Sequence, residues 1–268
     1  MKRRQAIPSA ARYTVDAAAK ALELLGVFSF REPRLSLADL AKRTGIPRAT
    51  AFRLLSTLEQ SGFLAKEHGA YQLGIKCFVL GNIVAGGLDL RETAHPHLVA
   101  LRDATRETTQ IAILDHWQVV YLERMLSPLP VGFMRARSGA ILPAYCTALG
   151  KLLLANLPEA EQRDLLTSMK LAKRGPNTIT SKKALSEELE HIGDAGFAVN
   201  DEELASELYA IAVPVRDAGA EVVAAVGLSA HSSVISLEEM VDALSPHLVS
   251  TADRISARLG YRRADEQS

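Results

Sequence analysis

The sequence predicts an α+β fold in two parts: a small N-terminal domain of helices and a β-hairpin, then a larger domain of helices and antiparallel strands. Apolar residues recur at helical spacing through residues 14–62, and from residue 109 the period changes to two. The later strands and helices do not alternate strictly, which argues against a doubly wound parallel sheet. A chain of 268 residues is long enough for two domains.

The stretch SLADLAKRTGIPRATAFRLLSTLEQSGFL, which begins at Ser36, contains two short helical patterns around a tight turn. Leu37 and Leu40 share one face of the first pattern, and Ser36 is its N-cap candidate. Gly45 can end that helix in the left-handed conformation, and Pro47 can open the second. Two such helices joined by a Gly-containing turn are typical of a helix-turn-helix.

The second helix of the motif, residues 47–61, would enter the major groove of DNA and read it with its N-terminal residues. Arg48 and Arg53 can donate to guanine or phosphate, and Thr50 can hydrogen-bond to either. The residues of the motif predicted to lie at the DNA are Ser36, Pro47, Arg48, Ala49, Thr50, Phe52 and Arg53. The alternative is a generic helical hairpin in another kind of domain.

A β-hairpin is predicted directly after this helix, with strands over residues 63–66 and 70–73 and Gly69 at its tip. In that position a hairpin is a wing, and Lys66 and His68 would lie near the DNA phosphates. Residues 14–28 are amphipathic and would supply the first helix. The predicted winged helix-turn-helix domain therefore spans residues 14–73.

An apolar segment follows, and residues 74–89 are predicted to form a linker helix. The segment is too short to span a membrane. It forms either a dimer interface or a buried core helix, and the sequence leaves both alternatives open.

Residues 90–260 are predicted to form the second domain, an antiparallel-rich sensor. Its expected helices cover residues 90–108, 148–156, 159–168, 182–195 and 237–259. Its expected strands cover residues 110–115, 119–124, 132–137, 196–199, 209–215 and 222–229.

The charge distribution separates the two parts. Residues 1–74 hold 12 Lys and Arg against 6 Asp and Glu, whereas the remaining residues are acidic overall, because the whole chain has 31 of each kind. A basic N-terminal third is the electrostatic footprint of a modular DNA-binding protein. Residues 1–13 are expected to form a flexible basic arm, and residues 261–268 a polar tail.

Location and compartment follow from what the sequence lacks. There is no apolar run of 18 residues and no signal peptide, so no membrane partner is expected. Two cysteines, Cys77 and Cys146, do not suggest a disulfide framework. These observations fit a reducing cytoplasm.

The segments LPAYCTALGKLLLA, DEEL, IAVPV and VVAAVGLS, together with the helix-turn-helix stretch, resemble the isocitrate lyase regulator (IclR) family of bacterial transcription regulators. The similarity covers about residues 14–260. It implies a winged helix-turn-helix, a linker helix and a GAF-like effector-binding domain. Such regulators form dimers or tetramers and bind near-palindromic operator DNA. A small organic acid alters the outcome, either by releasing the protein from DNA or by making it recruit RNA polymerase.

Within the family, the segments YCTALGK and IAVPV look most similar to those of regulators of aromatic-acid catabolism, which sense 4-hydroxybenzoate or protocatechuate. By the resemblance, the effector contacts fall on Gly139, Ala140, Asn200, Ala210, Gly227 and Ser229. Asn200 replaces an acidic residue of the family, and Ala210 and Gly227 replace small polar ones. The resulting pocket would be roomier and less polar, which suits a ring-bearing acid.

Arg135 and Arg137 are candidate counter-ions for the carboxylate of such an acid, and the alternative is that both lie on a solvated strand.

The rival class is an enzyme that uses Cys146, which just precedes a helix N-terminus. A nucleophile needs a base, and no motif marks one. The sequence ALGK lacks the spaced glycines of a phosphate loop, so no cofactor is expected. His95 and His97 could hold a metal, but no further ligand is marked by spacing. No catalytic and no metal-binding residue is therefore predicted.

Overall fold

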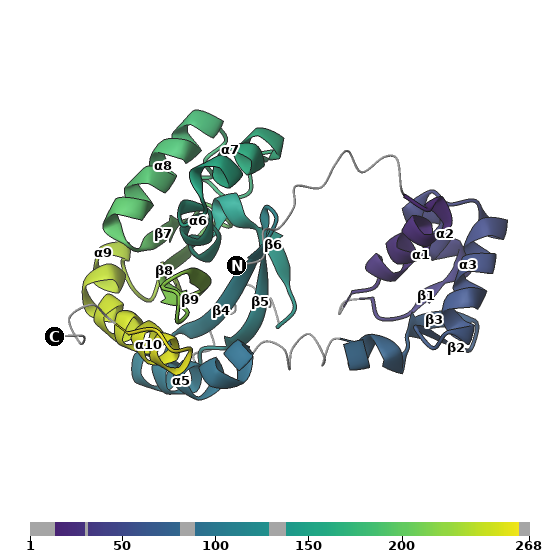
Figure 1. Cartoon of the computed structure of the whole chain (residues 1–268), viewed down its shortest axis with the longest axis horizontal. Coiled ribbons are helices and arrows are strands. Elements are labelled where there is room, and N and C mark those ends of the chain that lie inside the picture. Colours follow the sequence, from purple (N-terminus) through teal and green to yellow (C-terminus); the bar gives the residue numbers. More distant parts are fainter. Residues whose placement is uncertain (1–13, 30–31, 81–88, 129–137, 263–268) are drawn as a thin grey trace. The chain divides into compact units, whose positions relative to one another are not determined.

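The computed structural model describes residues 14–29, 32–80, 89–128 and 138–262 (Figure 1). The chain divides into two compact units, Met1–Gly87 and Leu88–Ser268. Among the described residues, no helix is long and apolar enough to cross a membrane.

The N-terminal unit is a three-helix domain with a small sheet. Its helices are α1 (Asp16–Gly26), α2 (Leu37–Thr44) and α3 (Arg48–Gln60), and its strands are β1 (Leu35–Ser36), β2 (Leu64–Glu67) and β3 (Ala70–Leu73). The antiparallel strands lie in the order β1-β3-β2. Its core is formed by Leu24, Leu40, Leu55, Leu64 and Tyr71.

Local chemistry explains the helix-turn-helix. Ser36 closes a capping box at the start of α2: its hydroxyl accepts from the Asp39 N–H, and the Asp39 carboxylate accepts from the Ser36 N–H. Gly45, at φ +69°, ends α2 in the left-handed conformation. Pro47 is the N-cap of α3. The predicted N-cap at Ser36 and the turn at Gly45 are confirmed, whereas α3 begins one residue after Pro47 and α1 begins two residues later than predicted.

The predicted wing is confirmed as the β2–β3 hairpin. Its two turn residues, His68 and Gly69, both have positive φ (+50° and +82°), which matches the twist of a tight hairpin. Lys66 and Tyr71 pair across the strands, and the Lys66 Nζ lies 5.2 Å from the centre of the Tyr71 ring. The strand β1 extends this sheet and was not predicted, because two residues are too few to show a period.

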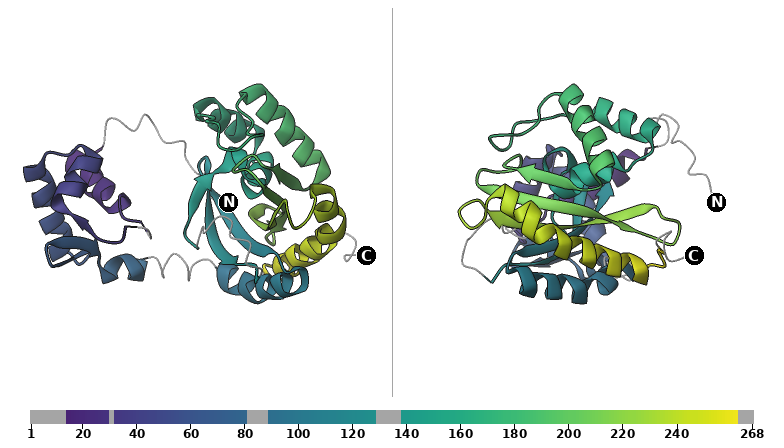
Figure 2. Two further views of the ribbon diagram at one scale, coloured as in Figure 1. Left: turned by 180° about the vertical axis from the view of Figure 1, so that it is seen from behind. Right: turned by 90° about the vertical axis from the view of Figure 1, so that its left-hand side faces the viewer.

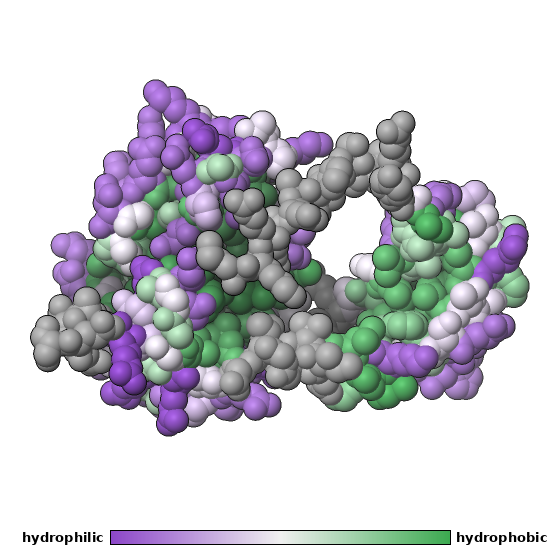
Figure 3. All heavy atoms as spheres, in the orientation of Figure 1, coloured by the Kyte–Doolittle hydropathy of each residue, from purple (hydrophilic) through white to green (hydrophobic). Residues whose placement is uncertain are grey.

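The predicted linker helix is described only in part: residues 75–80 are helical, and the rest of it lies outside the described residues. The side chains of Ile75 and Phe78 are 71% and 63% exposed. Figure 3 shows this apolar helix at the surface of its unit. Its described part is therefore not a buried core helix within the N-terminal unit.

The C-terminal unit is built on a six-stranded antiparallel sheet in the order β6-β5-β4-β9-β8-β7. The strands are β4 (Thr108–Asp115), β5 (Gln118–Met125), β6 (Ile141–Pro143), β7 (Ala198–Asp201), β8 (Leu208–Arg216) and β9 (Val222–His231). The helices are α5 (Asp89–Thr105), η2 (Ala144–Cys146), α6 (Ala148–Ala155), α7 (Glu159–Ser168), α8 (Lys182–Ala195), α9 (Leu237–Glu239), η3 (Met240–Leu244) and α10 (Ser245–Arg258).

This sheet separates two hydrophobic cores (Figure 2). Helix α6 packs on one face with α8 behind it, around Leu149, Leu152 and Leu189. Helices α5 and α10 cover the other face, around Leu98 and Leu248. The predicted α+β fold class is confirmed.

The prediction for the C-terminal helix needs correction, and one predicted strand cannot be compared with the structure. The long C-terminal helix is interrupted by a π-helical turn over Met240–Leu244, just before Pro246. Proline has no N–H to donate to the carbonyl four residues earlier, and its ring clashes with that carbonyl. The backbone hydrogen bonds there change from the α-helical to the wider π-helical pattern. The strand predicted over residues 132–137 lies outside the described residues.

A buried carboxyl at the end of α5 makes stability depend on pH. Glu107 is only 7% exposed, and burial raises its pKa to about 7. In the unfolded chain a glutamate titrates near pH 4.3. The folded state therefore binds this proton more tightly, and Glu107 lowers stability progressively as the pH rises from about 4 through 7.

Glu107→Gln is therefore expected to raise the free energy of unfolding by about 1–2 kcal/mol at pH 8 and to leave it unchanged at pH 4. Urea denaturation at both pH values measures this difference. An equal effect of the substitution at the two pH values would contradict the assignment of a raised pKa.

Candidate functional site

The exposed face of α3 carries the residues predicted to meet DNA. Ala51, Leu55 and Leu58 are buried against the rest of the unit. In and just before the first turns of α3 the following residues are exposed: Pro47, Arg48, Ala49, Thr50, Phe52 and Arg53. The structure therefore leaves two guanidinium groups, a hydroxyl and an aromatic ring accessible at the N-terminal half of one helix.

Neighbouring polar groups hold the loops around α3. The Arg43 guanidinium donates to both oxygens of Glu32, at 2.6 and 2.7 Å. Arg34 donates to Glu67 (3.1 Å) and Gln72 (3.0 Å) on the hairpin. Lys66 and His68 lie exposed on the wing, whereas the Ser36 hydroxyl is engaged by Asp39 within the capping box.

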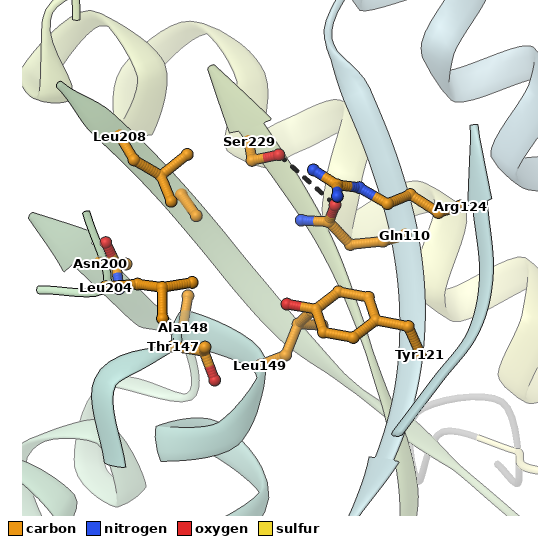
Figure 4. Close-up of a pocket in the computed structure, with 11 residues that line it drawn as sticks. Gln110, Tyr121, Arg124, Thr147, Ala148, Leu149, Asn200, Leu204, Leu208 and Ser229 are labelled. Carbon is orange, nitrogen blue, oxygen red and sulfur yellow. Dashed lines mark hydrogen bonds between the residues drawn. The ribbon is translucent and has the colours of Figure 1, made fainter. Parts of the chain in front are cut away.

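A pocket lies in the C-terminal unit, between the sheet and the first turn of α6 (Figure 4). It contains about 330 Å³ of empty space, including its opening to solvent. It is lined by Gln110, Tyr121, Arg124, Thr147, Ala148, Leu149, Asn200, Leu204, Leu208, Ala210 and Ser229.

Close packing positions the first turn of α6. Thr147 caps the helix by accepting from the Gly150 N–H at 3.0 Å. A Cβ on Gly150 would lie 2.3 Å from backbone atoms of Ala144, so only glycine allows this approach. The tight turn brings Thr147, Ala148 and Leu149 to the pocket.

A β-bulge brings Arg124 to the pocket. The partner of Ile111 is Glu123, but the partner of Ala112 is Tyr121, so Leu122 is an extra residue in β5. The alternation of faces shifts at a bulge. Tyr121 and Arg124 consequently share the pocket face, although strict alternation would place them on opposite faces.

One side of the pocket is polar and carries a positive charge. The Arg124 Cζ lies 6.0 Å from the centre of the Tyr121 ring, and the Ser229 hydroxyl donates to Gln110 Oε1 at 3.4 Å. Burial lowers the pKa of Arg124 and raises that of Tyr121 to about 12. Arginine stays charged in proteins, so a cation faces neutral hydroxyl and amide groups here.

The other side of the pocket carries Asn200, which is 1% exposed. Its Nδ2 donates to the carbonyl of Cys146 at 2.7 Å. Its Oδ1 is buried and makes no hydrogen bond with the described residues.

The structure brings together only some of the predicted effector residues. Asn200, Ala210 and Ser229 line the pocket, whereas Gly139, Ala140 and Gly227 do not. The Gly139 N–H was predicted to contact the effector, and this prediction is corrected. The N–H donates to the Tyr121 carbonyl at 2.7 Å and is not available to a ligand.

Gly227 is required for packing and does not enlarge the pocket. A Cβ at this position would lie 2.8 Å from the Ile211 carbonyl oxygen and 3.2 Å from Leu149 Cδ2. Arg135 and Arg137 lie outside the described residues.

Sequence reasoning missed Gln110, Tyr121, Arg124 and Thr147 among the residues that line the pocket. The period-two pattern of β4 and β5 could have placed Gln110 and Tyr121 on one face. It could not have placed Arg124 there, because nothing in the sequence marks the bulge.

Cys146 is not placed as a nucleophile. Its side chain is fully buried, and burial raises the pKa of its thiol to about 12, so it stays protonated. Within the described part of the chain, no group of three or more His, Cys, Asp or Glu side chains is placed to hold a metal ion. His95 instead lies with its Nδ1 3.5 Å from the Glu123 carboxylate.

Comparison with known proteins places the chain among transcription regulators. Residues 17–68 match the model of the IclR helix-turn-helix domain, and residues 83–257 match that of the bacterial transcriptional regulator IclR C-terminal domain. The chain is 32% identical to the HTH-type transcriptional regulator XynR of Escherichia coli (strain K12), over 92% of this chain and 98% of that protein. It is 30% identical to the Pca regulon regulatory protein of Pseudomonas putida, over 87% of this chain and 80% of that protein.

Solved structures show the same architecture. The crystal structure of the Thermotoga maritima IclR is similar with a TM-score of 0.71 and 30% identity, over 92% of this chain and 99% of that chain. An IclR homolog from Microbacterium hydrocarbonoxydans, solved in complex with 4-hydroxybenzoate, is similar with a TM-score of 0.80 and 27% identity, over 91% and 99% of the two chains. With its two matched domains and its pocket in the second, the chain belongs to the IclR family of ligand-responsive bacterial transcription regulators, not to a family of enzymes.

Proposed function

We propose that this regulator senses a small aromatic carboxylate and controls a catabolic operon as a repressor. The observation that supports this most directly is the pocket: a compact space with Arg124 at one side and apolar walls from Leu149, Leu204 and Leu208. A guanidinium in a low-dielectric site suits a carboxylate, and the leucines suit a ring. The similar protein solved with 4-hydroxybenzoate favours the same class of ligand.

In this proposal Arg124 takes the place of Arg135 and Arg137 as the carboxylate partner. Asn200, Ala210 and Ser229 complete the site. The loop at Gly139 and Ala140 and the residue Gly227 do not contact the effector in this proposal. They lie next to residues that line the pocket and hold them in position.

The DNA-binding surface in this proposal is the exposed face of α3 with the wing. Arg48, Thr50 and Arg53 would contact base edges and phosphates, and Lys66 and His68 the adjoining backbone. Such a regulator acts where the DNA is, in the cytoplasm. RNA polymerase would be a partner only at promoters that it activates.

A homodimer would place two α3 helices in successive major grooves, about 34 Å apart. The exposed apolar residues of both the first helix and the linker support self-association: Val15, Leu22, Ile75, Phe78 and Leu80. Two dimers could then pair into a tetramer.

The experiment that tests the proposal first enriches an operator from a random duplex library with the wild-type protein. Arg48→Ala is expected to weaken binding to this operator by about 10- to 100-fold, because a bidentate base contact provides roughly 1–3 kcal/mol. Binding is measured by fluorescence anisotropy at fixed salt. A thermal-shift screen with aromatic acids on the same two proteins is expected to give equal shifts.

Unchanged operator affinity for Arg48→Ala would remove α3 from the DNA interface. A thermal shift with short aliphatic acids alone would leave the regulator assignment intact and contradict the aromatic effector.

A further inference from the structure

We propose that the effector carries a hydrogen-bond donor at the end opposite its carboxylate, and that Asn200 Oδ1 accepts from this donor. The inference rests on the proposed function, because it takes the pocket as the effector site. It adds a second requirement to the ligand. Besides its carboxylate, the acid must carry a hydroxyl or amino group at the opposite end, so a plain carboxylic acid is not enough.

The hydrogen bond to Cys146 fixes the orientation of the Asn200 amide. The group 2.7 Å from its Nδ2 is the backbone carbonyl of Cys146, which can only accept a hydrogen bond. If the amide were turned over, two carbonyl oxygens would face each other. The nitrogen must therefore point to Cys146, and Oδ1 must point away from it.

Asn200 Oδ1 is a buried acceptor whose hydrogen-bonding capacity is unsatisfied within the described residues. Asn200 is 1% exposed, and Oδ1 has no hydrogen-bond partner among the described residues. Buried polar atoms normally have a partner, and one without it is costly. Asn200 pairs with Ala210 across β7 and β8, and the small alanine leaves space beside the amide.

The described side chains on this side of the pocket offer Asn200 Oδ1 no hydrogen-bond donor. The nearby lining residues Ala148, Leu204 and Leu208 have apolar side chains. The Thr147 hydroxyl accepts from the Gly150 N–H at 3.0 Å and lies 3.4 Å from the carbonyls of Pro143 and Ala144. Its proton is therefore directed to backbone carbonyls, and the donor for Asn200 must come with the ligand.

The chemistry of the two sides of the pocket determines the direction in which an acid would lie. A carboxylate placed at Oδ1 would bring two acceptors together, whereas Arg124 offers donors and a positive charge. Figure 4 shows Arg124 and Gln110 on one side of the space and Asn200 across it. The anionic end therefore binds at Arg124, and the donor end at Asn200.

The test is a calorimetric comparison of matched probes on the full-length protein. The donor probes are 4-hydroxybenzoate and 4-aminobenzoate, and the probes of similar size without a donor are benzoate and 4-fluorobenzoate. The misplaced donor is 2-hydroxybenzoate, and 4-hydroxybutanoate against butanoate is the aliphatic pair. The donor probes are expected to bind at least about tenfold more tightly than those without one, and 2-hydroxybenzoate to bind like benzoate.

Two variants separate this contact from general effects on the pocket. Asn200→Ala is expected to bring the ratio of the 4-hydroxybenzoate and benzoate dissociation constants to near one. Leu204→Ala, which removes an apolar wall, is expected to weaken both probes and keep their ratio. This comparison forms a double-mutant cycle between the side chain and the ligand hydroxyl.

Equal affinity of the wild-type protein for hydroxylated and plain acids would overturn the inference and leave the aromatic effector standing. A ratio that persists in Asn200→Ala would also overturn it. If only the aliphatic pair binds, with 4-hydroxybutanoate favoured, the inference holds and the aromatic proposal fails. Binding of none of the probes would overturn both.

Discussion

Replacing Lys151 with alanine is expected to lower the free energy of unfolding of the C-terminal domain by about 3–5 kcal/mol. Lys151 is 1% exposed and lies in α6, a helix whose other central residues are apolar. Its Nζ lies 2.5 Å from Glu203 Oε1 and 2.6 Å from Glu188 Oε1. Removing the ammonium would leave the Glu203 carboxylate buried beside a cavity.

The size of this effect follows from the difference between the two carboxylates. Glu203 is buried, and burial raises its pKa against the opposing effect of Lys151. Glu188 is partly exposed, so water can solvate it when the ammonium is lost. The expected penalty therefore comes from Glu203.

The matched control is the double variant Lys151→Met with Glu203→Gln, which removes the charges and nearly keeps the volume. It is expected to lose much less stability than Lys151→Ala, because no buried charge is left unpaired and Glu188 is solvated. Trp117 is the only tryptophan of the chain and lies in the C-terminal unit, so its fluorescence reports unfolding in urea. Equal losses in the two variants would show that packing, and not charge, determines the effect.

Arg124→Gln is expected to weaken the binding of an aromatic acid by at least about 30-fold, equivalent to 2 kcal/mol. Glutamine keeps a polar group at this position but loses the positive charge. Burial already lowers the pKa of Arg124, which means that the site disfavours the cation until an anion joins it. A carboxylate ligand therefore gains more here than at the surface.

Calorimetry with 4-hydroxybenzoate measures this change, and Arg124→Lys is the control that retains the charge. Operator binding without effector is expected to be the same in all three proteins, because Arg124 belongs to the C-terminal unit. An unchanged dissociation constant in Arg124→Gln would exclude Arg124 as the carboxylate partner.

Elements with local signals could be predicted closely. Helix α8 matches its predicted bounds, since Ser181 caps its start and Gly196, at φ +75°, ends it. The helix-turn-helix was predictable for the same reason: a capping box, a left-handed glycine and a proline lie within twelve residues.

The pocket could be predicted only in part, because its lining comes from strands that are distant in the sequence. Ser229 and Gln110 are separated by 119 residues and meet only because β4 pairs with β9. The resemblance to relatives located Asn200, Ala210 and Ser229. Arg135 and Arg137, the counter-ions that the sequence suggested, lie outside the described residues, and strict alternation alone hides Arg124.

The extra residue in β5 has a consequence for how pockets of this kind diverge. Because Leu122 is the extra residue of the bulge, its deletion would leave Tyr121 and Arg124 two positions apart in a regular strand and keep both on the pocket face. If the bulge were lost without a deletion, the arginine would turn toward α5 and a neighbour would face the ligand. In relatives, the two positions that match Tyr121 and Arg124 on the pocket face can therefore be two or three residues apart.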